Sequence, residues 1–336
     1  MCAGLVVASS PTGVTGSAAA AALGVPLKRG WNLGNTLEGC APSENPNGDW
    51  VFKSVAAAGF DWTRIPAQWG CHALEVEPYT VDPAFLATVN QTVSWARAHS
   101  LRAMVNTHHE NSWIDTTNKT VFNAALPRLV AIWKQIAEVF ASVPDDALVF
   151  ELFNEPNKMS VVQLNTMNAA LLSVIRASNP TRQVHLGGLA NMNSGWILSH
   201  EDAMAFHAED KHLALTVHSY DPWSFAGSSG PPPTHAPTAH TFDSEAMPKV
   251  MAGLKDWSVK HHIPVYLDEC GCTVMQTNRT ARLEYYHILR TSAEANGIGW
   301  AIWDDDGWWK TLDRKGDRTW DAGVMTALGL NAPPPR

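Results

Sequence analysis

The sequence is short of basic residues and of long apolar runs. It contains 24 Lys and Arg residues and 32 Asp and Glu residues, which gives a formal net charge of −8. A nucleic acid or an anionic membrane surface attracts a basic face, so this balance argues against either as the main partner. No apolar stretch approaches the roughly 20 residues that cross a bilayer. We therefore expect no nucleic-acid partner and no membrane partner.

Cysteine is also scarce, with five residues in the chain, none of them in the CxxC spacing of a structural zinc site. Cys40 and Cys71 each follow a predicted strand, and either a disulfide between neighbouring loops or two buried thiols fits that placement. A direct bond between Cys270 and Cys272 would be strained. Cysteine usage alone does not assign a redox compartment.

The N-terminal segment is rich in Ala, Gly, Ser, Val and Thr, and Lys28 is its first basic residue. The basic start of a secretory signal peptide is missing, and Pro11 and Gly13 interrupt the apolar run. We interpret residues 1–27 as a leader or signal-peptide remnant and residues 28–330 as one domain, because no linker divides them. These features favour an extracellular protein, which we expect to be a monomer.

Hydrophobic residues make up 45% of the chain, enough for a full core, and Trp is abundant, with 15 residues. Eight short apolar runs are predicted to form strands, and helical stretches separate most of them. These runs are Arg29–Leu33, Trp62–Ile65, Arg102–Thr107, Leu148–Phe153, Val184–Leu186, Leu213–His218, Val265–Glu269 and Gly299–Trp303. Helical periodicity is clearest in Pro83–His99, Leu126–Phe140, Val161–Ser178 and Arg279–Ala295.

This alternation predicts an α/β protein, a single-domain (β/α)8 TIM barrel with parallel strands. A doubly wound open sheet is the alternative, but the Gly-rich phosphate turn typical of it is missing after the first strand. The Pro-, Gly- and Ser-rich segment Pro222–Asp243 follows the sixth strand, and it fits either a solvated flap or a lid that contacts substrate.

Polar residues gather where the predicted strands end, which is where barrel enzymes build their sites. Glu155 follows the fourth strand and Glu269 ends the seventh, so the two face each other across the barrel mouth. Glycoside hydrolysis needs one carboxylic acid to protonate the leaving oxygen and one carboxylate to attack the anomeric carbon. Arg64 would keep a nearby carboxylate ionised, and Tyr220 would donate to the same oxygen.

At these residues the chain resembles glycoside hydrolase family 5, in particular its β-1,4-endoglucanases. The matching motifs, in the family's order, are GWNLGNTLEG (30–39), TRIPAQW (63–69), VNTHHE (105–110), FELFNEPN (150–157), VHSYDPWSF (217–225), PVYLDECG (264–271) and WAIWDDDGW (300–308). The resemblance implies Glu155 as acid/base and Glu269 as nucleophile. It also implies a set of residues around the cleaved sugar: Arg64, His108, Asn154, His218, Tyr220 and Trp303.

The same resemblance implies a cis peptide after Trp303 and retaining, endo-acting hydrolysis of a β-1,4-glucan without a cofactor. The partner would be a polysaccharide or an oligosaccharide. A β-mannanase, a mixed-linkage β-glucanase or a catalytically impaired carbohydrate-binding barrel are the alternatives.

The sequence departs from the family pattern beside the nucleophile, where Asp268 stands in place of the usual Gly and Cys270 in place of an aromatic residue. An Asp pointing at Glu269 would raise the pKa of that carboxyl by like-charge repulsion. Because neighbours along a strand face opposite ways, we expect Asp268 to point away from the pocket.

Two clusters of potential metal ligands lack the spacing of a known metal site. His108, His109 and Glu110 do not form HExxH, and Asp304–Asp306 lacks the alternating oxygen ligands of an EF-hand loop. We therefore expect no metal, and we interpret Asp304–Asp306 as a solvated loop with one residue at the cleft. Trp308 is the candidate for a stacking platform beyond the cleaved bond.

Overall fold

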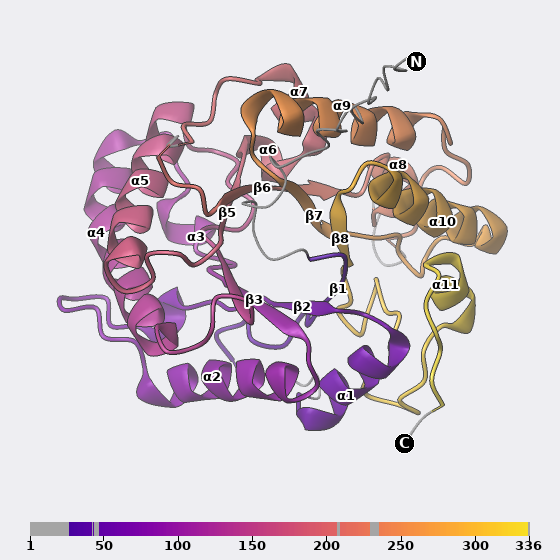
Figure 1. Cartoon of the computed structure of the whole chain (residues 1–336), viewed down its shortest axis with the longest axis horizontal. Helices are drawn as coiled ribbons and strands as arrows, with labels where there is room; N and C mark the ends of the chain where they lie inside the picture. The colour runs from indigo at the N-terminus through magenta and orange to yellow at the C-terminus, as the bar shows by residue number, and fades with distance from the viewer. Residues whose placement is uncertain (1–26, 42, 44–46, 207–208, 229–234, 335–336) are drawn as a thin grey trace, which may run out of the picture.

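The protein is described here as a computed structural model, covering residues 27–334 apart from residues 42, 44–46, 207–208 and 229–234 (Figure 1). The predicted leader lies outside the described residues except for Leu27. Eight parallel strands close into a barrel in the order of the sequence. They are β1 (Arg29–Asn32), β2 (Trp62–Ile65), β3 (Arg102–Asn106), β4 (Leu148–Glu151), β5 (Val184–Gly187), β6 (Leu213–Ser219), β7 (Val265–Cys270) and β8 (Gly299–Ile302). The (β/α)8 barrel is confirmed, and no strand end differs from its predicted position by more than two residues.

Helices surround the barrel and cover the outer face of the sheet (Figure 1). They are α1 (Asp49–Ala58), α2 (Pro83–Ala98), α3 (Asn111–Ile114), α4 (Lys119–Phe140), α5 (Val161–Ser178), α6 (Leu189–Met192), α7 (Ser194–Ser199), α8 (Trp223–Ala226), α9 (Ala246–His261), α10 (Arg279–Ala295) and α11 (Ala322–Ala327), with a 3-10 turn, η1, at Gly70–His72. None of the described helices is both long and apolar enough to span a membrane.

Helix α4 begins at Lys119, not at the predicted Leu126. The side-chain oxygen of Asn118 accepts hydrogen bonds from the backbone N–H groups of Thr120 and Val121, which caps the helix. Pro127 lies inside the helix instead of near its start. The prediction missed the first turns of the helix because it followed hydrophobic periodicity and not the cap at Asn118.

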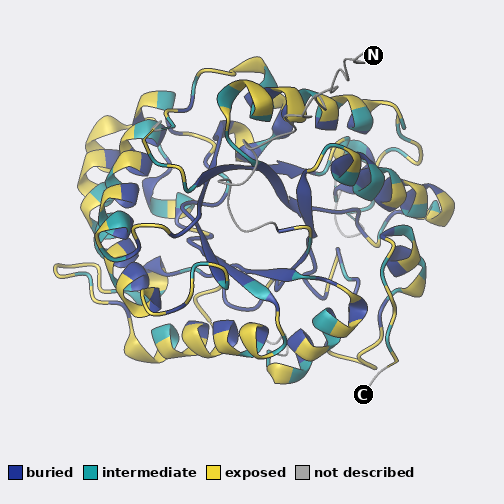
Figure 2. Ribbon diagram, in the orientation of Figure 1, coloured by how far each residue is buried: buried dark blue, intermediate teal, exposed yellow. Residues whose placement is uncertain are grey.

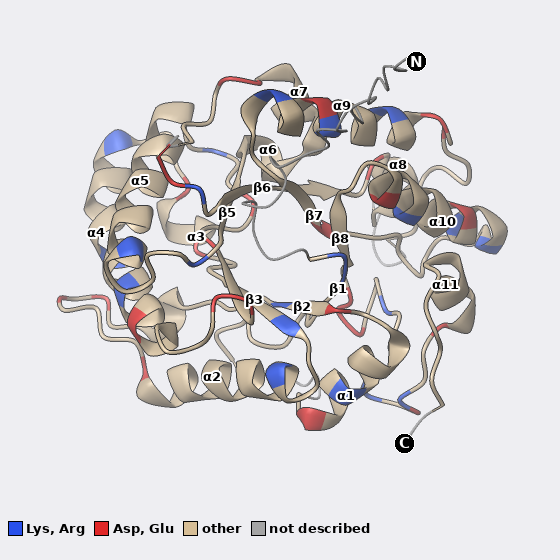
Figure 3. Cartoon of the chain, viewed as in Figure 1, with Lys and Arg blue, Asp and Glu red and all other residues tan. Residues whose placement is uncertain are grey.

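The main core lies between the barrel and its helices, so the strands are buried while the outer helix faces are exposed (Figure 2). Positive and negative residues are interspersed on the covering helices (Figure 3). A second, smaller apolar cluster fills one end of the barrel interior, and it consists of Leu27, Trp62, Met104, Val149, Ala214, Tyr266 and Ala301. Each strand residue of this cluster lies on the inward face, so the barrel is a packed core with no pore.

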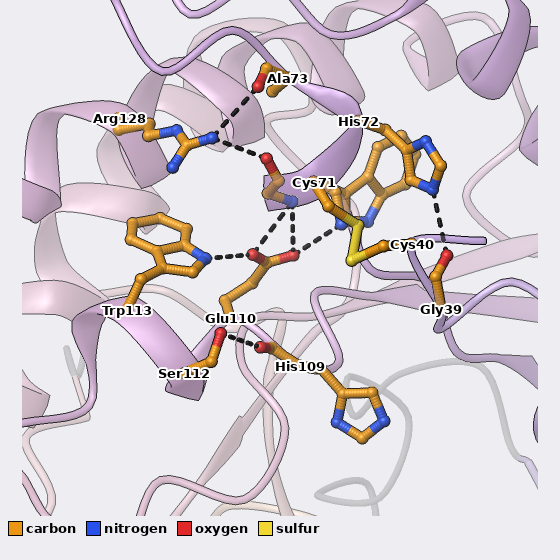
Figure 4. Close-up of a disulfide and its surroundings, with 12 residues drawn as sticks. Gly39, Cys40, Cys71, His72, Ala73, His109, Glu110, Ser112, Trp113 and Arg128 are labelled. Atoms are coloured by element: carbon orange, nitrogen blue, oxygen red, sulfur yellow. Dashed lines mark hydrogen bonds between the residues drawn. A yellow bond between two sulfur atoms is a disulfide. The ribbon is translucent and has the colours of Figure 1, made fainter.

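A disulfide joins Cys40 to Cys71 and ties the loop after β1 to η1 (Figure 4). Of the two alternatives that the sequence left open for this pair, the structure contains the disulfide. Cys270 and Cys272 are buried free thiols.

Glu110 anchors the same region from the loop after β3. Its carboxylate accepts hydrogen bonds from the backbone N–H of Trp69 at 2.6 Å, from that of Gly70 at 3.0 Å and from the indole of Trp113 at 2.8 Å (Figure 4). Glu110 therefore holds a loop in place, which accounts for its position beside the histidine pair.

The segment Pro222–Asp243 begins with the short helix α8, and its residues 229–234 lie outside the described part of the chain. Trp223, the first residue of α8, reaches the cleft described below. The choice between flap and lid for the whole segment stays open.

Candidate active site

A cavity of about 250 Å³ opens at the carboxyl ends of the strands. Its lining residues are Asn35, Glu38, His108, His109, Asn154, Glu155, Asn191, Tyr220, Trp223, Glu269, Trp303 and Trp309. Six of the eight predicted site residues belong to this lining. The other two, Arg64 and His218, lie buried behind it and contact the two glutamates.

A larger hollow of about 800 Å³ lies elsewhere, between the loop after β1 and helix α2. Among the described residues that line it, the one acidic side chain is Asp82, whose carboxylate caps α2 by accepting from the backbone N–H of Ala84. The described part of this lining therefore contains no pair of carboxyl groups that could act as acid and nucleophile.

Glu269 is held from two sides. Arg64 Nη1 donates to its Oε2 at 2.7 Å, and the Tyr220 hydroxyl donates to its Oε1 at 2.9 Å. The two donors therefore bind different oxygens of the carboxylate, whereas the sequence analysis placed them on the same one. Burial raises the pKa of Glu269, and the charges of His218 and Arg64 oppose that rise. Such fixed donors orient the carboxylate and favour its ionised form.

Arg64 is the centre of a buried network. Its guanidinium donates to both oxygens of Glu151, at 2.5 and 2.8 Å, and to the side-chain oxygens of Asn32 at 3.0 Å and Asn154 at 2.7 Å. Burial lowers the pKa of Arg64, but Glu151 and Glu269 outweigh that effect and raise it well above its ordinary value. Since Asn154 Oδ1 is engaged by Arg64, its NH2 group is the part left to donate into the cleft.

Glu151 was not predicted as a site residue. It is completely buried on β4 and pairs with Arg64 in a bidentate ion pair. The signal was present in the sequence, because a single Glu interrupts the apolar strand LVFELF. A charge in the middle of a core strand requires a buried partner.

Glu155 follows β4 in a tight turn and has a φ of 50°, a region that residues other than Gly rarely adopt. Its side chain is 30% exposed, and its Oε1 lies 2.9 Å from Nδ1 of His218, which is on β6. The turn therefore aims a partly solvated carboxyl at a buried imidazole.

Glu155, Glu269 and His218 form a compact group in which one ligand atom of each residue lies within 4.8 Å of the others. The two carboxyl groups are thus close to the roughly 5–5.5 Å separation of retaining glycosidases and well short of the roughly 6.5–9.5 Å of inverting ones. Within the described part of the chain, these three residues also form the group whose ligand atoms are close enough to hold a metal ion. The imidazole nitrogen that would bind it is already hydrogen-bonded to Glu155.

The charges in this group shift the pKa values of the residues within it and around it. Burial lowers the pKa of His218, but Glu269, Asp268 and Glu155 together outweigh burial and raise it to about 10. Burial and the two glutamates raise the pKa of Tyr220 well above its ordinary value, which keeps the phenol protonated as a donor. Burial and the charge of Arg64 lower the pKa of His108, so that imidazole stays neutral.

Asp268 does not line the cavity, but it is not on the opposite face of the strand either. It is completely buried inside the barrel, where Thr216 donates a hydrogen bond to it and His218 Nε2 lies 3.5 Å away. The pairing between β6 and β7 runs from Val217 with Leu267 to His218 with Glu269, so one residue of β7 is skipped. This irregularity breaks the alternation on which the prediction was based.

Trp303 lies at the end of β8 and lines the cleft, with its ring parallel to that of His108 at a centroid distance of 5.6 Å. The implied cis peptide after Trp303 is not present. The cis bonds in the described part of the chain precede Pro78 and Pro222.

Asp304–Asp306 is not the solvated loop that was predicted. All three residues are buried, and none lines the cavity. Asp304 accepts hydrogen bonds from the backbone N–H groups of Thr311 and Leu312, and Asp305 accepts from that of Trp309. These carboxylates serve as caps for the loop after β8, because each satisfies N–H groups that lack a helix or sheet partner.

Several lining residues were missed or placed differently by sequence reasoning. Glu38 lies in the first motif, and burial raises its pKa to about 7. Trp223 and Trp309 line the cleft, whereas Trp308, the candidate platform, is 43% exposed outside the lining. The sequence signal for Trp223 was its position in the VHSYDPWSF motif.

Comparison with known proteins matches residues 31–308 to the family model described as cellulase, glycosyl hydrolase family 5. Endoglucanase H of Acetivibrio thermocellus is 33% identical over 317 residues, which cover 89% of this chain and 32% of that protein. The chain thus spans about a third of the length of that relative. Endoglucanase A of Ruminococcus albus is 27% identical, over 85% of this chain and 83% of that protein.

A solved structure of a hyperthermophilic endo-β-1,4-glucanase in complex with substrate superposes with a TM-score of 0.81 at 26% identity, and it covers 90% of this chain and 97% of that one. The family model extends from within β1 to beyond β8 and includes Glu155 and Glu269. This chain belongs to the cellulase family, glycosyl hydrolase family 5.

Proposed function

We propose that this protein is an endo-acting β-1,4-glucanase that retains the configuration of the anomeric carbon, with Glu155 as acid/base and Glu269 as nucleophile. The observation that carries the proposal is the short separation of these two carboxyl groups, which leaves no room for a water between nucleophile and sugar. The relatives named endoglucanase support the choice of a β-1,4-glucan.

In the first step, Glu269 attacks the anomeric carbon while the bond to the leaving oxygen breaks. Arg64 and Tyr220 fix the carboxylate for this attack, and Glu155 transfers its proton to the leaving oxygen. Glu155 suits proton transfer because it is the more exposed of the two, at 30% against 9% for Glu269. The product of this step is a glycosyl ester on Glu269.

In the second step, a water enters from the side of Glu155. That carboxylate takes a proton from the water, whose oxygen bonds to the anomeric carbon as the bond to Glu269 breaks. Both residues return to their starting protonation states. Asn154 donates to a hydroxyl of the bound sugar, and Trp303 and His108 provide an aromatic surface beneath it.

The proposed substrate is a neutral polysaccharide or oligosaccharide, held by stacking and by hydrogen bonds to its hydroxyls. The proposed location is extracellular. The disulfide between Cys40 and Cys71 supports this location, since such bonds persist in oxidising compartments. We also propose that the protein acts as a monomer.

The test is release of reducing sugar from carboxymethylcellulose, konjac glucomannan and barley β-glucan by wild type, Glu155→Ala and Glu269→Ala. Glu284→Gln, an exposed position on α10, is the matched control. We expect hydrolysis of carboxymethylcellulose by wild type and control, and loss of about four orders of magnitude in both variants. Proton NMR of the earliest product should show the β anomer.

Preference for glucomannan with no action on carboxymethylcellulose would indicate a mannanase, and action on barley β-glucan alone a mixed-linkage glucanase. Binding of all three polymers without hydrolysis would indicate a carbohydrate-binding barrel. An α anomer as first product contradicts the retaining mechanism.

A further inference from the structure

Asp268 is a buried charge that the two catalytic steps above do not use. It stands where the family's usual residue has no side chain, and it is completely buried inside the barrel. Besides the hydrogen bond from Thr216, its carboxylate lies 3.5 Å from His185 Nδ1 and 3.5 Å from His218 Nε2. A buried carboxylate persists only where its neighbours compensate its charge.

Two imidazole nitrogens lack any closer partner. His185 Nδ1 and His218 Nε2 are buried, and neither has a hydrogen bond to another group among the described residues. Oδ2 of Asp268 is buried and without a hydrogen bond as well. Among the described residues, the carboxylate of Asp268 is therefore the group that compensates both nitrogens, and His218 is the one of the two histidines that also contacts Glu155.

His218 links Asp268 to Glu155. Its Nε2 faces Asp268 at 3.5 Å, and its Nδ1 faces Glu155 Oε1 at 2.9 Å. The chain of contacts therefore runs from a buried aspartate through an imidazole to the proposed acid/base group, which is the arrangement by which a carboxylate fixes a histidine tautomer in hydrolytic triads.

An ionised Asp268 can only accept hydrogen bonds, so His218 must keep its proton on Nε2. The other nitrogen, Nδ1, then matches both states of Glu155. In the cationic ring Nδ1 carries a proton too, and it donates to Glu155 Oε1 both while Oε2 holds the acid proton and after that proton has moved to the leaving oxygen. Without Asp268 the ring loses one of the anions that stabilise its charge, so the neutral imidazole, which has only one N–H group, becomes available.

The charged groups around His218 come from several strands. Asp268 and Glu269 face it from β7 and Glu155 from the loop after β4, while Arg64 on β2 and His108 in the loop after β3 act on the same cluster. Burial raises the pKa of Asp268, but His185, His218 and Arg64 outweigh burial and hold it below its ordinary value. The ionised aspartate is thus the deepest of three anionic partners of one imidazole.

We propose that Asp268 is a positioning residue of this enzyme, which acts through His218 by holding the ring as a cation with a proton on Nε2, so that Nδ1 donates to Glu155 before and after proton transfer without movement of the imidazole. This inference rests on the assignment of Glu155 as acid/base in the proposed function. It also explains how an acidic residue beside the nucleophile is compatible with catalysis, since its charge is directed at His218.

The kinetic test compares two substrates that differ in their need for an acid. A dinitrophenyl β-cellobioside has a leaving group that departs without protonation, whereas an unactivated cello-oligosaccharide needs the proton of Glu155. We expect Asp268→Asn to lower kcat/KM on the oligosaccharide by about 30-fold and on the dinitrophenyl glycoside by less than about threefold. Asp268→Gly, which restores the usual family residue, should show the same selectivity.

Met104→Ala is the matched control, because Met104 is equally buried in the barrel interior but belongs to the apolar cluster. Met104→Ala should leave the ratio of the kcat/KM values for the two substrates unchanged. An equal loss on both substrates in Asp268→Asn would assign Asp268 a purely structural role and overturn the proposal.

The spectroscopic test follows the ring nitrogens of His218 by ¹⁵N NMR across pH, with assignment through His218→Gln. We expect a cationic ring at pH 7 in wild type, and in Asp268→Asn a titration midpoint lower by about two pH units. An identical titration in both proteins also overturns the proposal. The NMR measurement does not require turnover. It therefore tests the role of Asp268 even if the protein hydrolyses no β-glycoside. Failure to hydrolyse any β-glycoside would contradict the proposed function and not the contact between Asp268 and His218.

Discussion

The two halves of the barrel interior are formed by the same strands but differ in chemistry. At the amino end of the strands the inward side chains are apolar, and two residues further along the inward positions are polar or charged. The pairs are Trp62 and Arg64 on β2, Met104 and Asn106 on β3, Val149 and Glu151 on β4, Ala214 and Thr216 on β6, and Tyr266 and Asp268 on β7. Both halves are equally buried.

The difference suggests that one half of the barrel interior contributes mainly to stability and the other half also to function. The apolar half contributes by filling volume, so its side chains are replaceable by others of similar shape. The polar half contains an Arg, a His and several carboxylates, each of which is tolerated only because the others compensate it. A substitution in the polar half should therefore alter both stability and catalysis, and one in the apolar half stability alone.

The largest effect is expected at the centre of the polar half. Arg64→Leu removes the cation shared by Glu151 and Glu269 and leaves the buried charge of Glu151 without an ion-pair partner. We expect the free energy of unfolding to fall by about 3–5 kcal/mol and kcat/KM to fall by about 10³-fold. Urea unfolding and hydrolysis of carboxymethylcellulose measure the two effects.

The double variant Arg64→Leu with Glu151→Leu sharpens this prediction. It should regain part of the lost stability, because no unpaired charge remains, and none of the activity. If the single variant is as stable as the wild type, the buried ion pair does not have the role assigned to it.

A smaller effect, confined to stability, is expected in the apolar half. Met104→Ala leaves a cavity among fully buried neighbours, and we expect unfolding to become easier by about 2–5 kcal/mol. At a temperature where the variant is folded, kcat/KM should stay within about twofold of wild type. A large loss of activity in the folded variant would show that the two halves are not separable.

The smallest effect depends on pH and concerns Glu38 at the rim of the cleft. Its carboxyl has a pKa of about 7 in the folded protein against an ordinary value of 4.5, because burial disfavours its charge. The folded state therefore binds this proton more tightly than the unfolded state does. The resulting stabilisation is complete below pH 4.5 and is lost as pH rises through about 7.

Glu38→Gln keeps a neutral acceptor of the same shape and removes this titration. Relative to the variant, wild type should lose up to about 3 kcal/mol of stability between pH 4.5 and pH 8. Urea unfolding of both proteins at the two pH values measures the difference. A difference that is the same at both pH values contradicts the assignment.

Much of the fold and of the site was predictable from local patterns. Short apolar runs alternating with helical periodicity indicated the closed barrel, and the polar residues at strand ends indicated the cleft that contains Glu155 and Glu269. The start of α4 was less predictable, because the cap at Asn118 and the proline at 127 are competing local signals whose balance depends on packing.

The sequence by itself determined which strands form, which residues stand at their carboxyl ends and which family motifs they match, because these depend on periodicity and residue type along the chain. The tertiary structure alone decided which buried groups meet. Glu151 pairs with Arg64, and Cys40 bonds to Cys71, because the fold brings together residues that are far apart in the sequence. Asp268 faces His218 because the register between β6 and β7 shifts at that point, and a shift of one residue changes the face that a strand side chain occupies.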